Sequence, residues 1–97
     1  HCPATAEVLP EIVDAVGGKM TIFVDGAIRS GMDMFKALAL GADAVLIGRP
    51  FVTTVYGGGE EGVQLYVQKL KAELADTMRM CGAHSLAEIK RSMLFGF

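Results

Sequence analysis

Two short apolar segments limit what this chain can fold into. Residues 20–24 and 44–47 contain no charged side chain, and their apolar residues do not alternate with polar ones. This pattern is typical of a strand in a parallel sheet, which is covered on both faces. A helical pattern over 31–40 separates the two segments, so strand, helix and strand follow within about 30 residues, as in a βαβ crossover. We therefore predict an α/β fold with two parallel neighbouring strands, at about 20–24 and 44–47.

Glycines and capping residues indicate the first two helices. Residues 4–16 have a helical composition that ends at the glycine pair 17–18, and Pro10 predicts a break or kink within it. Ser30 and Asp33 stand three residues apart, as in a capping box, so the helix after the first strand is expected to begin at Ser30.

The C-terminal half contains one long helical pattern, from 60 to 81, which Gly82 is expected to end. A short apolar stretch at 51–56 and a glycine-rich flexible connector at 57–59 precede it. Ser85 and Glu88 form a second capping-box pattern, which predicts a last short helix to about residue 94. No linker or repeat divides residues 1–97, so the chain is expected to be one structural unit.

The bulk composition excludes several classes of partner. The net charge is −2, which gives no basic field for nucleic acid or an acidic membrane surface. The chain is 52% hydrophobic, yet no apolar run approaches the roughly 18 residues needed to cross a bilayer. A short chain this apolar is expected to be a piece of a larger fold. Cys2 and Cys81 lack metal-type spacing and indicate reduced thiols, so a cytoplasmic location is predicted.

Glycine and arginine follow each predicted strand. Residues 25–30 come after the first strand, and Gly48, Arg49 and Pro50 come after the second. Glycine lets backbone N–H groups approach a ligand closely, and arginine binds phosphate with two parallel hydrogen bonds. The pattern fits an open doubly wound sheet or a (β/α)8 barrel. Barrels commonly bind phosphate with the loops after strands 7 and 8 and a short extra helix, so we predict the C-terminal quarter of a barrel.

The predicted phosphate-binding residues are Asp25, Gly26, Ala27, Ile28, Arg29, Gly48 and Arg49. Backbone N–H groups of residues 26–29, 48 and 49 are expected to donate to phosphate oxygens. Asp25 would repel a phosphate, so it is expected to hold the loop or to accept from a ribityl or ribose hydroxyl. Arg29 and Arg49 could instead be surface ion-pair partners. No catalytic triad and no metal-ligand set is visible.

Three phrases of the sequence, at 24–29, 35–42 and 46–50, together resemble the C-terminal end of the FMN-dependent 2-hydroxy-acid oxidases and dehydrogenases, the glycolate oxidase and L-lactate oxidase family. The stretches 73–78, 81–82 and 85–89 resemble the same family's closing helices. The resemblance implies a (β/α)8 barrel, FMN as cofactor and the seven residues above as part of the FMN site. It also implies a glycine where this chain has Ala27; a left-handed backbone there would cost about 1–2 kcal/mol.

The resemblance further implies that the catalytic base lies outside this chain. The family's histidine belongs to a His-Gly-Gly-Arg-like motif several residues before the stretch resembling residues 3–5, so His1 does not match it. The whole enzyme is expected to oxidise a small L-2-hydroxy acid to the 2-oxo acid, and this chain alone is expected to be inactive. Its partners would be further copies of itself or the N-terminal part of the barrel.

Two other functions stay open from the sequence. A flavin-dependent isopentenyl diphosphate isomerase has a barrel that ends on similar loops. A non-enzymatic, self-associating βαβ module that binds phosphate groups would also fit, since two strands leave open sheet edges and uncovered apolar faces.

Overall fold

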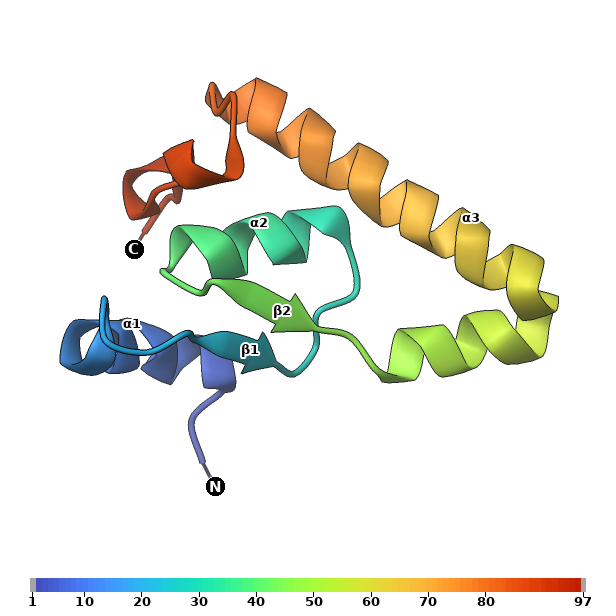
Figure 1. Ribbon diagram of the computed structural model, residues 1–97, viewed down its shortest axis with the longest axis horizontal. Coiled ribbons are helices and arrows are strands. Elements are labelled where there is room, and N and C mark those ends of the chain that lie inside the picture. Colours follow the sequence, from blue (N-terminus) through green and yellow to red (C-terminus); the bar gives the residue numbers. More distant parts are fainter. Residues whose placement is uncertain (1, 97) are drawn as a thin grey trace.

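The computed structural model describes residues 2–96, which form a two-stranded sheet with helices packed against it (Figure 1). The helices and strands are, in order, α1 (Thr5–Val16), β1 (Phe23–Asp25), α2 (Gly31–Ala39), β2 (Ala44–Leu46) and α3 (Arg49–Cys81). Two 3-10 turns follow, η1 (Leu86–Glu88) and η2 (Arg91–Met93). The predicted order of helix, strand, helix, strand and helix is confirmed.

The two strands are parallel neighbours, as predicted. Their register places Phe23 opposite Ala44 and Asp25 opposite Leu46. Residues at the entry to the strands fix this register: the Ile22 N–H donates to the Asp43 carboxylate at 2.8 Å, and the Asp43 N–H donates back to the Ile22 carbonyl at 2.9 Å. Because the strands start in register, both of them end at the same edge of the sheet.

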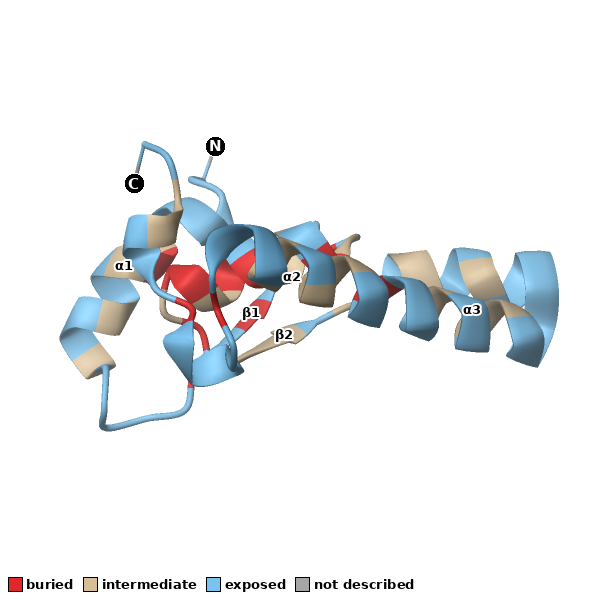
Figure 2. Ribbon diagram, turned by 90° about the horizontal axis from the view of Figure 1, so that it is seen from above, coloured by how far each residue is buried: buried red, intermediate tan, exposed pale blue. Residues whose placement is uncertain are grey.

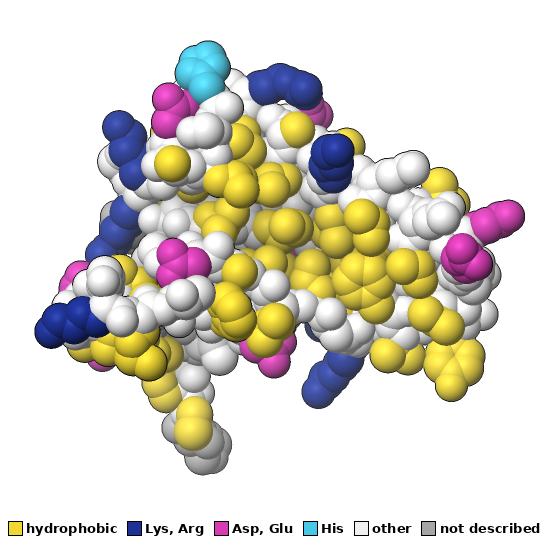
Figure 3. All heavy atoms as spheres, in the orientation of Figure 1, with side chains coloured by type: hydrophobic (Ala, Val, Ile, Leu, Met, Phe, Trp, Pro, Cys, Tyr) yellow, Lys and Arg dark blue, Asp and Glu magenta, His cyan; other side chains and the backbone are white. Residues whose placement is uncertain are grey.

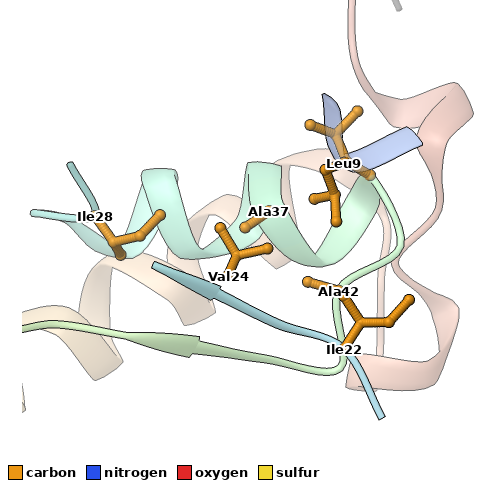
Figure 4. Packing of buried hydrophobic residues seen from close by; sticks show 7 residues of the cluster. Leu9, Ile22, Val24, Ile28, Ala37 and Ala42 are labelled. Atoms are coloured by element: carbon orange, nitrogen blue, oxygen red, sulfur yellow. The ribbon is translucent and has the colours of Figure 1, made fainter. Parts of the chain in front are cut away.

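The core lies between one face of the sheet and the helices α1 and α2. Figure 4 shows side chains from α1, β1, α2 and the segments that adjoin the strands gathered there. The buried members of this cluster are Leu9, Ile22, Val24, Ile28, Ala37, Leu40 and Ala42. A second cluster surrounds Phe35 and joins α2 to the C-terminal turns through Ala83 and Ile89. In Figure 2 the buried residues gather around α2 and β1, while the far end of α3 is mostly exposed.

The opposite face of the sheet is open, which corrects the prediction of strands covered on both sides. Phe23 on β1 is 62% exposed and Leu46 on β2 is 48% exposed. Both helices that pack on the sheet lie on its other face, so nothing in residues 2–96 covers these side chains. Hydrophobic side chains also form a broad band across the molecule as drawn in Figure 3. The sequence pattern predicts strands packed on both faces, but residues 2–96 pack against one face only.

Helix α3 has two arms joined by a sharp corner at Gly59, whose φ of 57° and ψ of −141° are not helical. The second arm begins near residue 60, as predicted. The first arm was only partly predicted: it begins at Arg49, and Gly57 and Gly58 are helical rather than a flexible connector. The arms touch where Gly62 passes Thr54, since a Cβ on Gly62 would lie 2.5 Å from the Thr54 carbonyl oxygen.

Two further expectations are wrong. Helix α1 continues through Pro10 without a break, because its packed face holds Leu9 in the core despite the lost N–H group. The segment 85–94 forms two 3-10 turns rather than one α-helix. Ser85 and Glu88 do form the expected capping box, but the backbone is extended at Ile89 and Lys90, where Ile89 turns into the core.

Candidate functional site

A cleft of about 380 Å³ lies at the carboxyl ends of the two strands. All seven residues predicted to bind phosphate line it, namely Asp25, Gly26, Ala27, Ile28, Arg29, Gly48 and Arg49. Leu46 and Pro50 complete the lining. The parallel register explains why residues 20 positions apart meet here, since both loops leave the same edge of the sheet.

Backbone N–H groups without a protein partner surround this cleft. Within residues 2–96, no hydrogen bond uses the N–H of Gly26, Ala27 or Ile28 in the first loop, or those of Gly48 and Arg49 in the second. Backbone N–H groups are strong donors and are almost always paired when they are not solvated. The N–H of Arg29 differs from the prediction, because it donates to the Asp33 carboxylate at 3.0 Å. Of the hydrogen-bond donors of Arg29, only the guanidinium is therefore free to face a ligand.

Three side chains hold the loop between β1 and α2. The hydroxyl of Thr5, on α1, donates to the Asp25 carbonyl oxygen at 2.9 Å. Asp33 holds the N–H of Arg29, and the hydroxyl of Tyr66, on α3, donates to the Arg29 carbonyl oxygen at 2.7 Å. The carboxylate of Asp25 makes no hydrogen bond in the described part of the chain, so Thr5 rather than Asp25 itself secures this end of the loop.

The loop includes two residues with left-handed backbone. Gly26 has a φ of 114° and Ala27 a φ of 57°. Ala27 is the one non-glycine residue among 2–96 with positive φ, and its Cβ makes that conformation unfavourable by about 1–2 kcal/mol. This is the strain that the sequence predicted for a left-handed backbone at this position.

The backbone conformation at position 48 does not require glycine. The φ of Gly48 is −115°, which any residue can adopt, and a Cβ placed on Gly48 would meet no atom within 4 Å. The side-chain position of this cleft-lining residue is therefore open. Gly48 is the N-cap of α3, where the helix dipole favours a negative group, and the N–H of Phe51 already donates to its carbonyl oxygen at 3.0 Å.

The N-terminus of α2, by contrast, is occupied by protein groups. The Ser30 hydroxyl accepts from the Asp33 N–H at 3.1 Å, which confirms Ser30 as the predicted cap. The Glu73 carboxylate, from α3, accepts from the Gly31 N–H at 3.0 Å. Two donors of α2 are thereby satisfied within the protein, and the free donors are concentrated in the loop and at the start of α3.

Arg29 and Arg49 are the cations of the cleft, and both are exposed. Between residues 2 and 96 the structure contains one ion pair, Arg79 with Asp76, so neither cleft arginine has the surface carboxylate partner that was the alternative interpretation. Two guanidinium groups and five free N–H groups around one cleft have the chemistry suited to an anion with several oxygens, such as a phosphate.

Other reactive side chains lie away from the cleft. His84 is exposed beyond the end of α3, and His1 lies outside the described residues. Cys2 and Cys81 are free and exposed. Over 2–96, no cluster of three or more histidine, cysteine, aspartate or glutamate side chains could hold a metal ion, and no helix is both long and apolar enough to cross a membrane. Among residues 2–96, the carboxylate of Asp25 is the one general base that lines the cleft.

Sequence reasoning missed the residues that support the loop. Thr5, Tyr66 and Glu73 lie on helices far from residues 25–30 in the sequence. The one available signal was Tyr66, which lies among the apolar residues of the helical pattern 60–81 that were expected to pack. Because a tyrosine hydroxyl usually has a hydrogen-bond partner where the ring packs, Tyr66 could have been expected to bond a neighbouring element.

Comparison with known proteins identifies the family. The family model for FMN-dependent dehydrogenase matches residues 1–95, so this chain belongs to the FMN-dependent dehydrogenase family. The resemblance seen in the sequence is thereby confirmed. FMN is the cofactor of this family of flavoprotein oxidoreductases.

Several named relatives match nearly the whole chain. Human 2-hydroxyacid oxidase 1 is 47% identical over 92 residues, and L-lactate oxidase of Roseobacter sp. (strain GAI101) is 45% identical over 95 residues. These alignments cover 95% and 98% of this chain but 25% and 26% of the relatives. A rice enzyme named peroxisomal (S)-2-hydroxy-acid oxidase GLO4 is 47% identical over 92 residues, again 95% of this chain and 25% of the relative.

Solved structures agree with the fold. Mandelate oxidase with benzoyl-formic acid superposes with a TM-score of 0.89 at 42% identity, covering 93% of this chain and 27% of that one. A mandelate oxidase mutant with a C4a-OH-FMN adduct gives the same TM-score and identity, with 93% and 27% covered. The chain thus spans about a quarter of the length of the proteins it matches.

Proposed function

We propose that this chain is the FMN phosphate-binding portion of an enzyme that oxidises small L-2-hydroxy acids, of the lactate or glycolate type, to 2-oxo acids. Residues 1–97 would form the C-terminal quarter of a (β/α)8 barrel, with β1 and β2 as its seventh and eighth strands. The chain spans about a quarter of relatives named hydroxy-acid oxidases, and its open sheet face matches a barrel whose other strands lie in the rest of the protein.

The observation that carries the proposal is the cleft with free donors on both loops. The N–H groups of residues 26–28, 48 and 49 would donate to phosphate oxygens, and the two guanidinium groups would balance the charge. Gly48 supports the same conclusion, because the fold leaves its side-chain position empty without needing glycine there. Asp25 stands at the cleft with a free carboxylate, suited to accept from a ribityl hydroxyl.

In the complete enzyme the bound flavin would accept the two electrons of the oxidation. The residues of this chain would fix the phosphate end of FMN and thereby orient the ring system toward the remaining strands. Arg29 and Arg49 would provide charge-assisted bonds, each worth about 1.5–3 kcal/mol.

The chain on its own is expected to oxidise no hydroxy acid. No histidine faces the cleft in the described residues, and Asp25 is the one carboxylate there. The measurement is dye reduction by the purified 97-residue polypeptide with FMN and L-lactate or glycolate. Activity that depends on FMN would show that the base lies within this chain.

Gly48→Ala tests the phosphate site in the full-length enzyme. Gly48 lines the cleft, so a methyl group there is expected to crowd a phosphate bound to the N–H groups of residues 48 and 49. We expect FMN affinity to fall about 30-fold, the effect of losing one or two charge-assisted bonds. Riboflavin, which lacks the phosphate, should bind the variant and the parent enzyme equally well. Fluorescence titration of the apoenzyme with both flavins measures the two affinities.

Gly57→Ala is the matched control, because Gly57 is helical, touches nothing within 4 Å with an added Cβ, and does not line the cleft. It should leave the affinity for both flavins unchanged. An FMN affinity that survives Gly48→Ala would contradict a phosphate bound between the two loops.

The other functions make different predictions. An isomerase would do no net oxidation; the family match and the names of the relatives favour the oxidase reading. A His-Gly-Gly-Arg-type motif upstream in the parent gene would support it further. A self-associating module would use the exposed sheet face with Phe23 and Leu46; a well-folded monomer of the 97-residue chain in sedimentation would argue against such association. The cytoplasmic location stays a prediction.

A further inference from the structure

We propose that Tyr66 is a positioning residue for the phosphate cleft. Through its hydroxyl it holds the loop 25–30 in the conformation that presents free N–H groups and the Arg29 guanidinium to a phosphate. The inference rests on the proposed function of the cleft and adds a residue that does not line the cleft itself.

Tyr66 connects three parts of the site. Its hydroxyl donates to the Arg29 carbonyl oxygen at 2.7 Å. Its ring packs edge to face against Phe51, with 5.0 Å between ring centroids and 70° between the planes. Phe51 lies two residues after Arg49, in the first arm of α3, whereas Tyr66 lies in the second arm. One side chain therefore ties the first loop to the helix that starts at the second loop.

The hydrogen bond from Tyr66 is one of two that hold the backbone of Arg29. The N–H of Arg29 is held by Asp33 and its carbonyl by Tyr66, so the backbone from which the guanidinium extends is fixed at both peptide groups. Two residues earlier, Ala27 has an unfavourable positive φ. A loop with strained backbone and free N–H groups would relax to another conformation unless bonds from neighbouring elements opposed it.

The surroundings keep the Tyr66 hydroxyl a donor. Burial raises its pKa above the ordinary value, and the carboxylates of Glu73 and Asp33 raise it further, against a smaller opposing effect of Arg29. The neutral form, which carries the donated proton, therefore persists through neutral and mildly alkaline pH. A second cleft of about 420 Å³ is lined by Tyr66 together with Arg29 and Arg49, which places the tyrosine beside both cations.

Tyr66→Phe in the full-length enzyme tests the proposal, since it removes the hydroxyl and keeps the ring against Phe51. We expect the affinity of the apoenzyme for FMN to fall about fivefold, the effect of one hydrogen bond. Riboflavin affinity should change by less than about twofold, because riboflavin has no phosphate to meet the loop. The ratio of the two affinities is the readout, since a purely structural role would lower both equally.

Thr77→Val is the matched control. The Thr77 hydroxyl donates to the Glu73 carbonyl oxygen at 2.8 Å, on the same helix and outside the cleft. Thr77→Val should leave the ratio of FMN affinity to riboflavin affinity unchanged. The proposal is overturned if Tyr66→Phe leaves FMN affinity unchanged or lowers the affinities for FMN and riboflavin by the same factor. Gly48→Ala separates the hypothesis about Tyr66 from the hypothesis about the phosphate site. If Gly48→Ala lowers FMN affinity and Tyr66→Phe does not, the cleft binds phosphate without needing Tyr66. If neither variant lowers FMN affinity, the cleft is not the phosphate site.

Discussion

Replacing Gly31 with alanine is expected to destabilise this part of the enzyme by about 3 kcal/mol or more, at the upper end of what overpacking costs. A Cβ on Gly31 would lie 2.3 Å from the Leu74 backbone nitrogen and 2.6 Å from the Leu70 carbonyl oxygen. These are backbone atoms of α3, so no rotamer change can relieve the clash. The start of α2 would have to move away from α3 and lose the bond between the Gly31 N–H and Glu73.

Chemical denaturation of the apoenzyme measures this effect. Gly58→Ala is the matched control, since Gly58 is helical and an added Cβ would meet nothing within 4 Å. That substitution should be neutral or stabilise the protein by roughly 0.5–1 kcal/mol, as alanine favours a helix over glycine. A Gly31→Ala enzyme as stable as its parent would show that α2 and α3 cross less closely than described.

Replacing Arg49 with methionine is expected to weaken FMN binding about 100-fold. Methionine retains an unbranched apolar chain but removes the guanidinium, which can make two charge-assisted bonds to a phosphate. The fold should survive, because Arg49 is exposed and makes no ion pair within residues 2–96. Titration of the apoenzyme with FMN gives the affinity, and the loss should shrink as salt is added because the attraction is partly ionic.

Arg79→Met provides the comparison for a lost positive charge. Arg79 forms an exposed ion pair with Asp76 on α3 at 3.0 Å and does not line the cleft. Its loss should change FMN affinity by less than about twofold, since exposed pairs contribute little. Equal losses in the two variants would mean that net charge, rather than a contact of Arg49, governs flavin binding.

The features that the sequence predicted well are local. Each strand was recognised from its own apolar residues, and Ser30 and Gly82 end up where capping rules put them, with Gly82 left-handed at a φ of 81°. The seven cleft residues were recognised because they lie at a strand end or within four residues after one. Parallel strands bring such positions together whatever the details of packing, so this part of the site needed no tertiary information.

The features that escaped prediction depend on tertiary contacts. Whether Pro10 bends a helix depends on the packing of Leu9, and whether the Phe23 face is covered depends on what packs against it, which residues 2–96 do not supply. The N–H of Arg29 looked available in the sequence, because nothing there shows that the Asp33 carboxylate would accept a hydrogen bond from it rather than from the N–H of Ser30. The support from Tyr66 required knowledge of the corner at Gly59.

The corner at Gly59 also sets an order of assembly. It turns α3 back so that Tyr66 and Glu73 reach Arg29 and Gly31, which precede them by 37 and 42 residues. During synthesis the loop 25–30 leaves the ribosome before Tyr66 and Glu73, so the bonds of these two residues to Arg29 and Gly31 can form only later. A nascent chain that ends before residue 66 would carry all seven predicted phosphate-binding residues and still lack the bond from Tyr66 to Arg29. Flavin binding at this cleft is therefore expected only after residue 66 has been synthesised.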